Sequence, residues 1–342
     1  MKRWQKAILS TFLVLGALLS AGITSTIGWR PVVGPKARTL TDRRFEPSPV
    51  RLARGEYIVR NVSGCLFCHS DLDPSQEGLP VKAGLAGAGR QWTAEDMPWL
   101  TAPNLTPDAE TGAGSWTDDT LARAIREGIG HDGRALFPLM PYANFAKMSD
   151  EDLASVITYI RSLPAVRRTH PKTAIPFPVS RLIYSAPQPI EGTVAAPDVG
   201  TPEQRGQYLV TLASCADCHT PMVQGQLVEG MAFAGGNVFK YGDARAVRAS
   251  ANLTPAPNGI PYYNEALFLE TIRTGRVRDR KISDVMPWAH YRNMTDEDLK
   301  SIFAYLQTLK PVDHYVDNAL PATACAQCTL EHGGGERNKK RE

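Results

Sequence analysis

"RGEYIVRNVSGCLFCH" at residues 54–69 recurs as "RGQYLVTLASCADCH" at residues 205–219. The correspondence continues downstream, where "MPYANFAKMSDEDLASVITYIRSL" (140–163) matches "MPWAHYRNMTDEDLKSIFAYLQTL" (286–309). Between the first match and the last, the offset changes only from 151 to 146 residues. Self-similarity over such a length indicates a duplicated domain of roughly 110 residues rather than a short motif met twice.

Each copy predicts the same helices. Ser149 and Thr295 stand three residues before Asp152 and Asp298, which fits an N-terminal capping box with Asp in place of Glu. Apolar residues then recur at helical spacing up to a proline that ends each helix. A second helix is expected before each C-x-x-C-H, and a third is expected to end at a glycine. The residues concerned are Tyr57 and Tyr208 on the second helix, and Gly128 and Gly275 after the third.

The N-terminus carries a long uncharged run behind a basic flank. Lys2, Arg3 and Lys6 precede residues 7–27, and 21 helical residues span about 31 Å, enough for a bilayer core. A positive flank stays in the cytoplasm, so we expect residues 1–30 to be a membrane anchor with the rest of the protein exported. The alternative is a cleaved signal peptide, with Ser20 and Gly22 as the small residues before the cut.

All six cysteines fall in C-x-x-C pairs, and two of those pairs are followed by histidine. In an exported protein, the C-x-x-C-H motif is typical of covalent haem c attachment, with two thioether bonds and the imidazole as an iron ligand. Zinc or a redox dithiol would require further Cys or His nearby, or a βαβ pattern. We therefore predict two covalently bound haems. Their sites are Cys65, Cys68 and His69, and Cys215, Cys218 and His219.

A sixth iron ligand distinguishes electron transfer from catalysis, because a thioether closes the distal site and raises the potential. Met140 and Met286 occupy matched "MP-aromatic" positions and are the predicted ligands. Met148 and Met294 also correspond, but they enter a helix and are expected to pack in the core.

These features resemble class I cytochrome c over about 50–164 and 203–311. More narrowly, "NLTPDAETGAGSWTDDTLARAIREGIGHDGRALFPLMPY" is similar to the cytochrome c subunit of membrane-bound alcohol and gluconate dehydrogenases. The resemblance implies that Asn104, Thr106 and Trp116 lie around the haem edge. Those subunits usually carry three haem domains, and this protein has two intact motifs, so its particular partner stays open.

The expected architecture is mainly α, with two tandem class I cytochrome c domains after one transmembrane helix. The boundaries are 1–30 for the anchor, 45–164 for the first domain, 165–202 for a proline-rich linker, 203–312 for the second domain and 313–342 for a tail. We expect the linker to lie along the domains, with His170 as a surface histidine.

The third cysteine pair, in "CAQCT" at 325–329, lacks the histidine that haem attachment needs. An oxidising compartment favours a local disulfide between Cys325 and Cys328. A contact with a partner subunit, or a metal site with His332 and His314, are the other interpretations. The final "GGGERNKKRE" is expected to be flexible.

The charge balance gives no indication of a nucleic-acid partner, and we expect none. After residue 30 the sequence holds 34 basic and 35 acidic side chains, since four of its 38 basic residues precede that point. We predict an electron-transfer protein of the bacterial inner membrane, with its haem domains in the periplasm and no substrate chemistry of its own. Its redox partner would be a dehydrogenase, a quinol-oxidising complex or a terminal oxidase. The alternatives are a dihaem enzyme, such as a peroxidase or thiosulfate dehydrogenase, and the cytochrome subunit of a cbb3-type oxidase.

Overall fold

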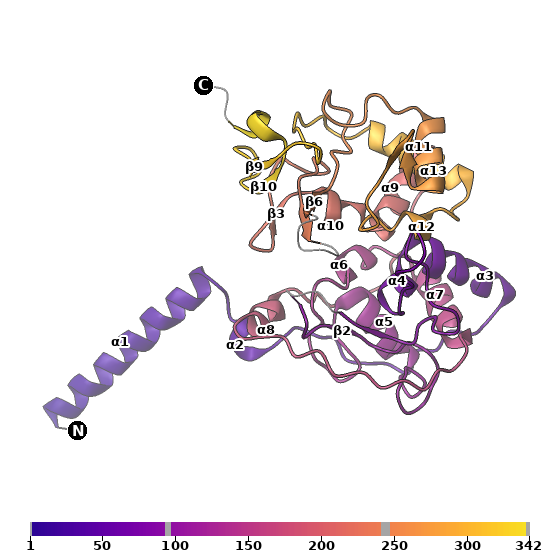
Figure 1. Ribbon diagram of the computed structural model, residues 1–342. Helices are drawn as coiled ribbons and strands as arrows, with labels where there is room; N and C mark the ends of the chain where they lie inside the picture. The colour runs from indigo at the N-terminus through magenta and orange to yellow at the C-terminus, as the bar shows by residue number, and fades with distance from the viewer. Residues whose placement is uncertain (1, 93–96, 241–246, 340–342) are drawn as a thin grey trace. The chain divides into compact units, whose positions relative to one another are not determined.

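The computed structural model describes residues 2–92, 97–240 and 247–339, and helices dominate its regular structure (Figure 1). The helices are α1 (Arg3–Ser25), α2 (Arg30–Val33), α3 (Pro49–Tyr57), the π-helix η1 (Ile58–Val62), α4 (Cys65–Cys68), α5 (Asp118–Glu127), α6 (Tyr142–Phe145), α7 (Asp150–Ser162), α8 (Val179–Leu182), the 3-10 helix η2 (Ile183–Ser185), α9 (Pro202–Leu212), α10 (Cys215–His219), α11 (Glu265–Thr274), α12 (Trp288–Tyr291), α13 (Asp296–Gln307) and the 3-10 helix η3 (Gly335–Asn338).

The strands are short and pair as antiparallel hairpins. They are β1 (Arg90–Gln91) with β2 (Thr101–Ala102), β3 (Met222–Val223) with β4 (Gln226–Leu227), β5 (Val238–Lys240) with β6 (Val247–Ala249), β7 (Arg276–Val277) with β8 (Arg280–Lys281), and β9 (Ala322–Ala324) with β10 (Glu331–Gly333). The prediction of a mainly helical protein is confirmed.

The protein consists of two compact units, and the first repeat is divided between them. Unit 1 comprises Met1–Arg44, Trp116–Ala146 and Ala174–Gly192, and unit 2 comprises Phe45–Ser115, Lys147–Thr173 and Thr193–Glu342. Unit 2 therefore holds both C-x-x-C-H motifs, whereas Met140 belongs to unit 1.

Unit 1 contains the apolar helix α1, which is long and apolar enough to cross a membrane. The segment after it is tied to α5 by Arg38, whose guanidinium donates to both Asp119 oxygens at 2.7 Å. The same guanidinium donates to Glu127 at 2.7 Å. Helix α5 begins after the N-cap Thr117 and ends at Gly128 with φ 74°, so the predicted glycine stop is confirmed.

In unit 2 the first helix of each repeat packs across the last helix of the same repeat, α3 on α7 and α9 on α13 (Figure 1). Gly55 and Gly206 stand at the two crossings. A Cβ at Gly55 would collide with the Ser155 carbonyl, and one at Gly206 with the Ser301 carbonyl. Glycine is required there because the helix backbones approach each other directly.

The capped helices begin where predicted, but the capping box is built differently. Ser149 accepts from the Asp152 N–H at 3.1 Å, as expected of an N-cap. The Asp152 carboxylate does not return to the Ser149 N–H, and Tyr208 of the other repeat bridges the two. The Tyr208 hydroxyl accepts from the Ser149 N–H at 3.1 Å and donates to Asp152 at 2.8 Å. Aspartate is one methylene shorter than glutamate, and the tyrosine hydroxyl fills the gap.

The second capped helix repeats this arrangement with the partners exchanged. The Tyr57 hydroxyl accepts from the Thr295 N–H at 3.0 Å and donates to Asp298. Arg54 pairs with Asp152 and Arg205 pairs with Asp298, each within its own repeat. Each repeat thus supplies one tyrosine to complete the helix cap of the other.

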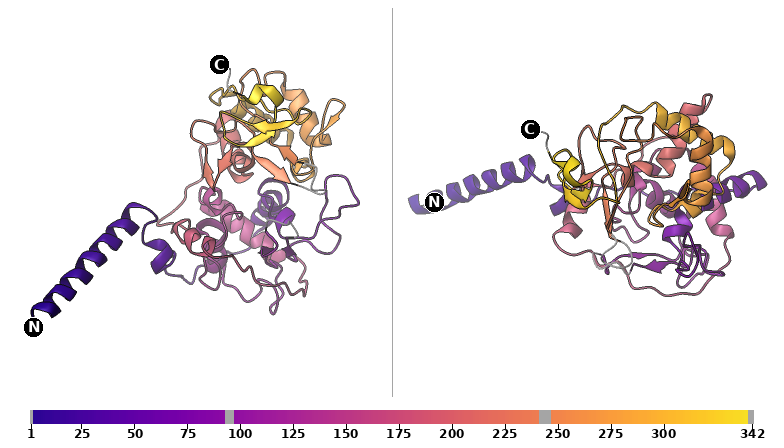
Figure 2. Two further views of the ribbon diagram at one scale, coloured as in Figure 1. Left: turned by 60° about the vertical axis from the view of Figure 1, so that its left-hand side comes forward. Right: turned by 45° about the horizontal axis from the view of Figure 1, so that its top comes forward.

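His170, which was predicted to be a surface histidine, is half-buried, and its Nε2 lies 2.8 Å from the Ala88 carbonyl. The prediction of a flexible C-terminal segment is wrong for residues 333–339, and residues 340–342 lie outside the described residues. The C-terminal segment is folded through residue 339: β9 and β10 form a hairpin beside η3 (Figure 2). The physical reason is Asn338, which is buried and donates to the carbonyls of Thr323 and His332 at 3.1 and 2.7 Å.

Candidate haem-binding sites

The first C-x-x-C-H forms a single helical turn, α4, which places both sulfurs on the same short segment. Gly64 precedes it with φ 64°, in the left-handed region that glycine adopts readily. His69 ends the turn, and its Nδ1–H donates to the Pro103 carbonyl at 2.8 Å. Because a carbonyl can only accept, this bond fixes the tautomer and leaves Nε2 as a lone pair for iron.

The second motif reproduces this geometry on α10. His219 Nδ1–H donates to the Ala251 carbonyl at 2.8 Å, so Nε2 is again the available ligand atom. The backbone behind each histidine is held in the same way. Gly89 N–H donates to the His69 carbonyl at 2.8 Å, and Gly235 N–H donates to the His219 carbonyl at 2.7 Å.

The pKa values of the motif cysteines argue against thiol redox chemistry. Burial, with Cys68 nearby, raises the pKa of the Cys65 thiol to about 12, and burial raises that of Cys215 to about 12. A redox dithiol requires a lowered pKa. Burial also lowers the pKa of His69 to about 4, which keeps the imidazole neutral as an iron ligand must be. The residues at both motifs therefore fit haem c.

Asn104 and Thr106 stabilise the loop next to the first C-x-x-C-H segment by hydrogen bonds. The Asn104 amide donates to the Val166 carbonyl at 2.8 Å, and its oxygen accepts from the Thr106 N–H and hydroxyl at 2.9 and 2.7 Å. Asn252 and Thr254 make the corresponding bonds in the second repeat. Their side chains hold the loop that bears Pro103 or Ala251, and hence the carbonyl that orients each histidine.

Trp116, the third residue implied by the resemblance, stacks on His131 with ring centroids 4.1 Å apart. Both rings lie in unit 1.

The predicted distal methionines occupy matched turns. Met140 and Met286 are half-buried, and each carbonyl accepts from the residue two positions on, at 2.8 and 2.7 Å. Met286 shares unit 2 with His219, whereas Met140 lies in unit 1. Met148 and Met294 are each only 1% exposed, which agrees with their predicted place in the core.

The two attachment turns are neighbours in unit 2. His290 Nε2 accepts a hydrogen bond of 2.8 Å from the N–H of Gly64, immediately before Cys65. The pKa of Tyr291 is raised well above its usual value, chiefly by burial and further by Cys215, Cys218 and Cys68. The Tyr291 hydroxyl also donates to the Ala213 carbonyl at 2.9 Å, so one short helix, α12, contacts the segments that precede both C-x-x-C-H turns. Sequence comparison alone missed His290, because it aligns with Asn144 and has no matching histidine.

Comparison with known proteins finds similarity to cytochromes c. The cytochrome c family model matches residues 203–310. The alcohol dehydrogenase (quinone) cytochrome c subunit of Gluconobacter oxydans is 27% identical over 281 residues, covering 76% of this chain and 55% of that protein. The gluconate 2-dehydrogenase cytochrome c subunit of Pantoea cypripedii is 28% identical over 76% of this chain and 60% of that protein. A diheme cytochrome c-type protein of Cereibacter sphaeroides is 27% identical over 76% of this chain and 86% of that protein.

The chain spans 55% to 65% of the length of the alcohol dehydrogenase subunits that it matches. Residues 203–310 match the cytochrome c family, and this range contains the C-x-x-C-H sequence of Cys215, Cys218 and His219. This part of the chain is a cytochrome c domain, and the chain is similar to proteins named as the cytochrome c subunits of an alcohol dehydrogenase (quinone) and of a gluconate 2-dehydrogenase.

Proposed function

We propose that the protein is a dihaem c-type cytochrome that relays single electrons and has no substrate chemistry of its own. Two tandem cytochrome c domains, 45–164 and 203–312, would each hold one haem through the motifs described above. When bound, each haem supplies a one-electron couple. The observation that carries the proposal is the pair of equivalent C-x-x-C-H turns, each with its imidazole fixed through Nδ1.

The protein's own residues account for how the two sites would communicate. His290 and Tyr291 on α12 contact the segments that precede the first and second attachment turns, Gly64 and Ala213. These contacts would keep both turns next to the same short helix. Met140 and Met286, as sixth ligands, would close both distal positions and favour the reduced state. Two closed sites argue against the dihaem enzyme, which needs one open iron.

The membrane placement is part of the proposal. Helix α1 would span the inner membrane once, with its basic N-terminal flank in the cytoplasm and both haem domains in the periplasm. The relatives named as dehydrogenase subunits favour a dehydrogenase as electron donor. A quinol-oxidising complex as donor, and a terminal oxidase as acceptor, are the other candidate partners.

The test is purification of the full-length protein from native membranes in detergent, followed by haem quantification. We expect two haems per molecule, low-spin spectra, and a copurifying partner that reduces or oxidises them. Double substitution of Cys65 and Cys68 by alanine should remove one haem, and the same change at Cys215 and Cys218 should remove the other. The matched control, alanine at Cys325 and Cys328, should keep both. A third haem, or a high-spin haem that turns over peroxide, would contradict the proposal.

A further inference from the structure

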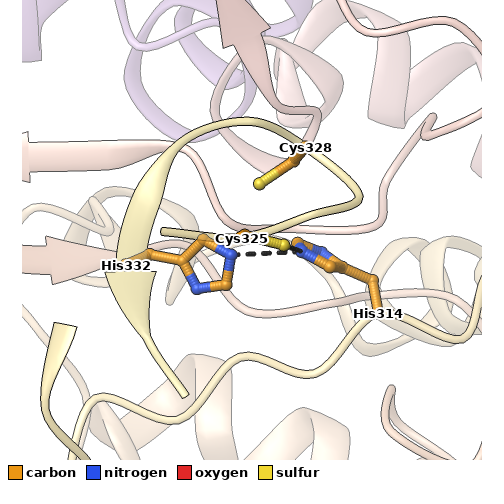
Figure 3. A group of neighbouring side chains, drawn as sticks. All are labelled: His314, Cys325, Cys328 and His332. Carbon is orange, nitrogen blue, oxygen red and sulfur yellow. Dashed lines mark hydrogen bonds between the residues drawn. The ribbon is translucent and has the colours of Figure 1, made fainter. Parts of the chain in front are cut away.

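Four side chains outside the haem motifs converge at the C-terminal end of unit 2. The ligand atoms of His314, Cys325, Cys328 and His332 all lie within 4.8 Å of one another. Cys325 is 4% exposed and the other three side chains are fully buried. Figure 3 shows the four pointing toward a common centre, with both cysteine sulfurs on the loop that faces the two imidazoles.

Two of the separations between the four ligand atoms match the edges of a tetrahedron around one ion. His314 Nε2 lies 3.2 Å from His332 Nε2, and Cys325 Sγ lies 3.4 Å from His314 Nε2. Zinc–nitrogen bonds of about 2.0 Å and zinc–sulfur bonds of about 2.3 Å give tetrahedral edges of about 3.3 Å for N···N and about 3.5 Å for N···S. Two of the measured separations therefore agree with a shared four-coordinate ion.

The hydrogen bonds of the imidazoles decide what faces the centre. His314 Nδ1–H donates to the Ala234 carbonyl at 2.9 Å, and His332 Nδ1–H donates to the Gly333 carbonyl at 2.9 Å. Both Nε2 atoms then present lone pairs to each other across 3.2 Å. With the protons on Nδ1, the two Nε2 lone pairs and the nearby Cys325 sulfur converge on one point, as the ligands of a cation do. Backbone acceptors at Nδ1 are the usual support of metal-binding histidines.

The surroundings are built to hold this geometry. Gly236, at φ +88°, lies against the imidazoles: a Cβ there would stand 2.6 Å from His314 Cε1. Met231 and Ala234 are buried against the two cysteines, with Val228, Val312 and Leu330 packed around them. Asn338 clamps the hairpin by donating to the His332 carbonyl at 2.7 Å. An apolar shell of this kind keeps water from the centre.

We propose that His314, Cys325, Cys328 and His332 bind one structural Zn²⁺. Two sulfur and two nitrogen ligands in a tetrahedron are typical of zinc, and four protein ligands leave no open position for catalysis. Binding joins the metal to two thiolates and releases two protons to solvent. The cysteines are not joined as a disulfide in the structure, so the interpretation favoured by the sequence gives way to the metal site.

The zinc would fasten the tail to the loop behind the second haem site. The His314 ring is hydrogen-bonded to the Ala234 carbonyl. The N–H of Gly235, the residue after Ala234, donates to the His219 carbonyl at 2.7 Å. In the first repeat His170 contacts the equivalent carbonyl of Ala88, and that repeat has no cysteine beyond its haem pair. The metal site therefore belongs to the second repeat alone.

Metal analysis of the full-length protein purified in detergent tests the proposal. The wild type should contain one zinc per molecule, and zinc-edge X-ray absorption should show two sulfur and two nitrogen neighbours. His314→Gln and Cys328→Ser should lower the zinc content at least tenfold. His170→Gln, at the matching position of the first repeat, should leave it unchanged. No zinc in the wild type, or non-haem iron in its place, would overturn the proposal.

A measurement on the wild type alone guards against variants that fail to fold. Before chelation, alkylation under native conditions should modify neither Cys325 nor Cys328. After a strong chelator removes the zinc, both should be modified, as read by peptide mass. If denatured, unreduced protein accepts no alkyl group at either residue, the pair is a disulfide and the zinc site is refuted.

Discussion

Replacing Tyr208 by phenylalanine removes one hydroxyl that links the two repeats. That hydroxyl accepts from the Ser149 N–H and donates to Asp152, and both partners belong to the start of α7. The ring remains, so packing is preserved and the change isolates the hydrogen bonds. We expect a clear loss of stability, because Ser149 has no second acceptor at its N–H among the bonds of the described residues.

The magnitude follows from burial. Tyr208 is 9% exposed and Ser149 is 4% exposed, so water cannot readily replace the lost bonds. A buried donor left unsatisfied costs about 1–3 kcal/mol. Asp152 keeps its ion pair with Arg54 at 2.7 Å, which limits the loss to the tyrosine's share. Tyr57→Phe should cost less, since Thr295, its N–H partner, is exposed.

Denaturant unfolding of the full-length protein in detergent, followed by circular dichroism, measures the change. The wild type, Tyr208→Phe, Tyr57→Phe and the double variant form one set, and Tyr262→Phe, at an exposed tyrosine, is the control. The reasoning is refuted if Tyr208→Phe lowers the free energy of unfolding no more than the control does. It is also refuted if Tyr57→Phe lowers the free energy of unfolding more than Tyr208→Phe does.

Alkaline pH gives an independent readout of the same hydroxyl. Burial, with Asp152 nearby, raises the pKa of Tyr208 to about 12 from an ordinary value of 10.0. Its neutral form is therefore favoured in the folded state, and the associated stability is present below pH 10 and is lost as pH rises toward 12. Tyr208→Phe should lose less stability over this range than the wild type does. Equal slopes for the two proteins would contradict the assigned environment.

Two further changes test the haem ligation and the helix crossing. Met286→Ala should abolish the near-infrared sulfur-to-iron band of one haem and lower the potential of that haem. Met294 is buried, so Met294→Ala should lower the free energy of unfolding by about 2–5 kcal/mol and leave the spectrum unchanged. Loss of the band in Met294→Ala alone would reverse the assignment. Gly206→Ala should destabilise by about 1–3 kcal/mol despite alanine's better helix propensity, because its Cβ collides with the Ser301 carbonyl. Gly200→Ala, which would meet only the ends of the Asp198 and Gln204 side chains, is the control in the same unfolding assay, and equal effects at both glycines would contradict the close crossing.

The sequence was sufficient to predict those parts of the fold that depend on local pattern. Capped helices, the glycine stops of α5 and α11, and the helices before each C-x-x-C-H all follow from residues near one another in the sequence. The capping box of Ser149 and Asp152 was half right, because its missing half comes from Tyr208, which is remote in sequence. The repeat had already matched Tyr57 with Tyr208. Nothing local indicated that each hydroxyl serves the other repeat.

The glycines at the helix crossings were missed for a related reason. Gly55 and Gly206 stand in the matched segments "RGEY" and "RGQY", where a glycine inside a helix reads as an unfavourable choice. The reason for each glycine is visible only in the folded structure, because the carbonyls of Ser155 and Ser301 on the partner helices occupy the space that a side chain would need. A glycine kept at the same place in both copies of a duplicated helix was the available signal.

The C-terminal cluster shows how a shared contact can be extended in one repeat only. His170 and His314 contact carbonyls at equivalent positions, Ala88 and Ala234, next to the glycines that donate to the carbonyls of His69 and His219. His170 contacts its carbonyl through Nε2, whereas His314 uses Nδ1, so the Nε2 atom of His314 faces His332 and Cys325. That difference of one ring nitrogen, together with a hairpin that supplies two sulfurs and a second imidazole, converts a loop contact into a four-ligand site. Spacing along the sequence gives no information about ring orientation, and the cysteine pair therefore resembled a disulfide until the fold placed the histidines beside it.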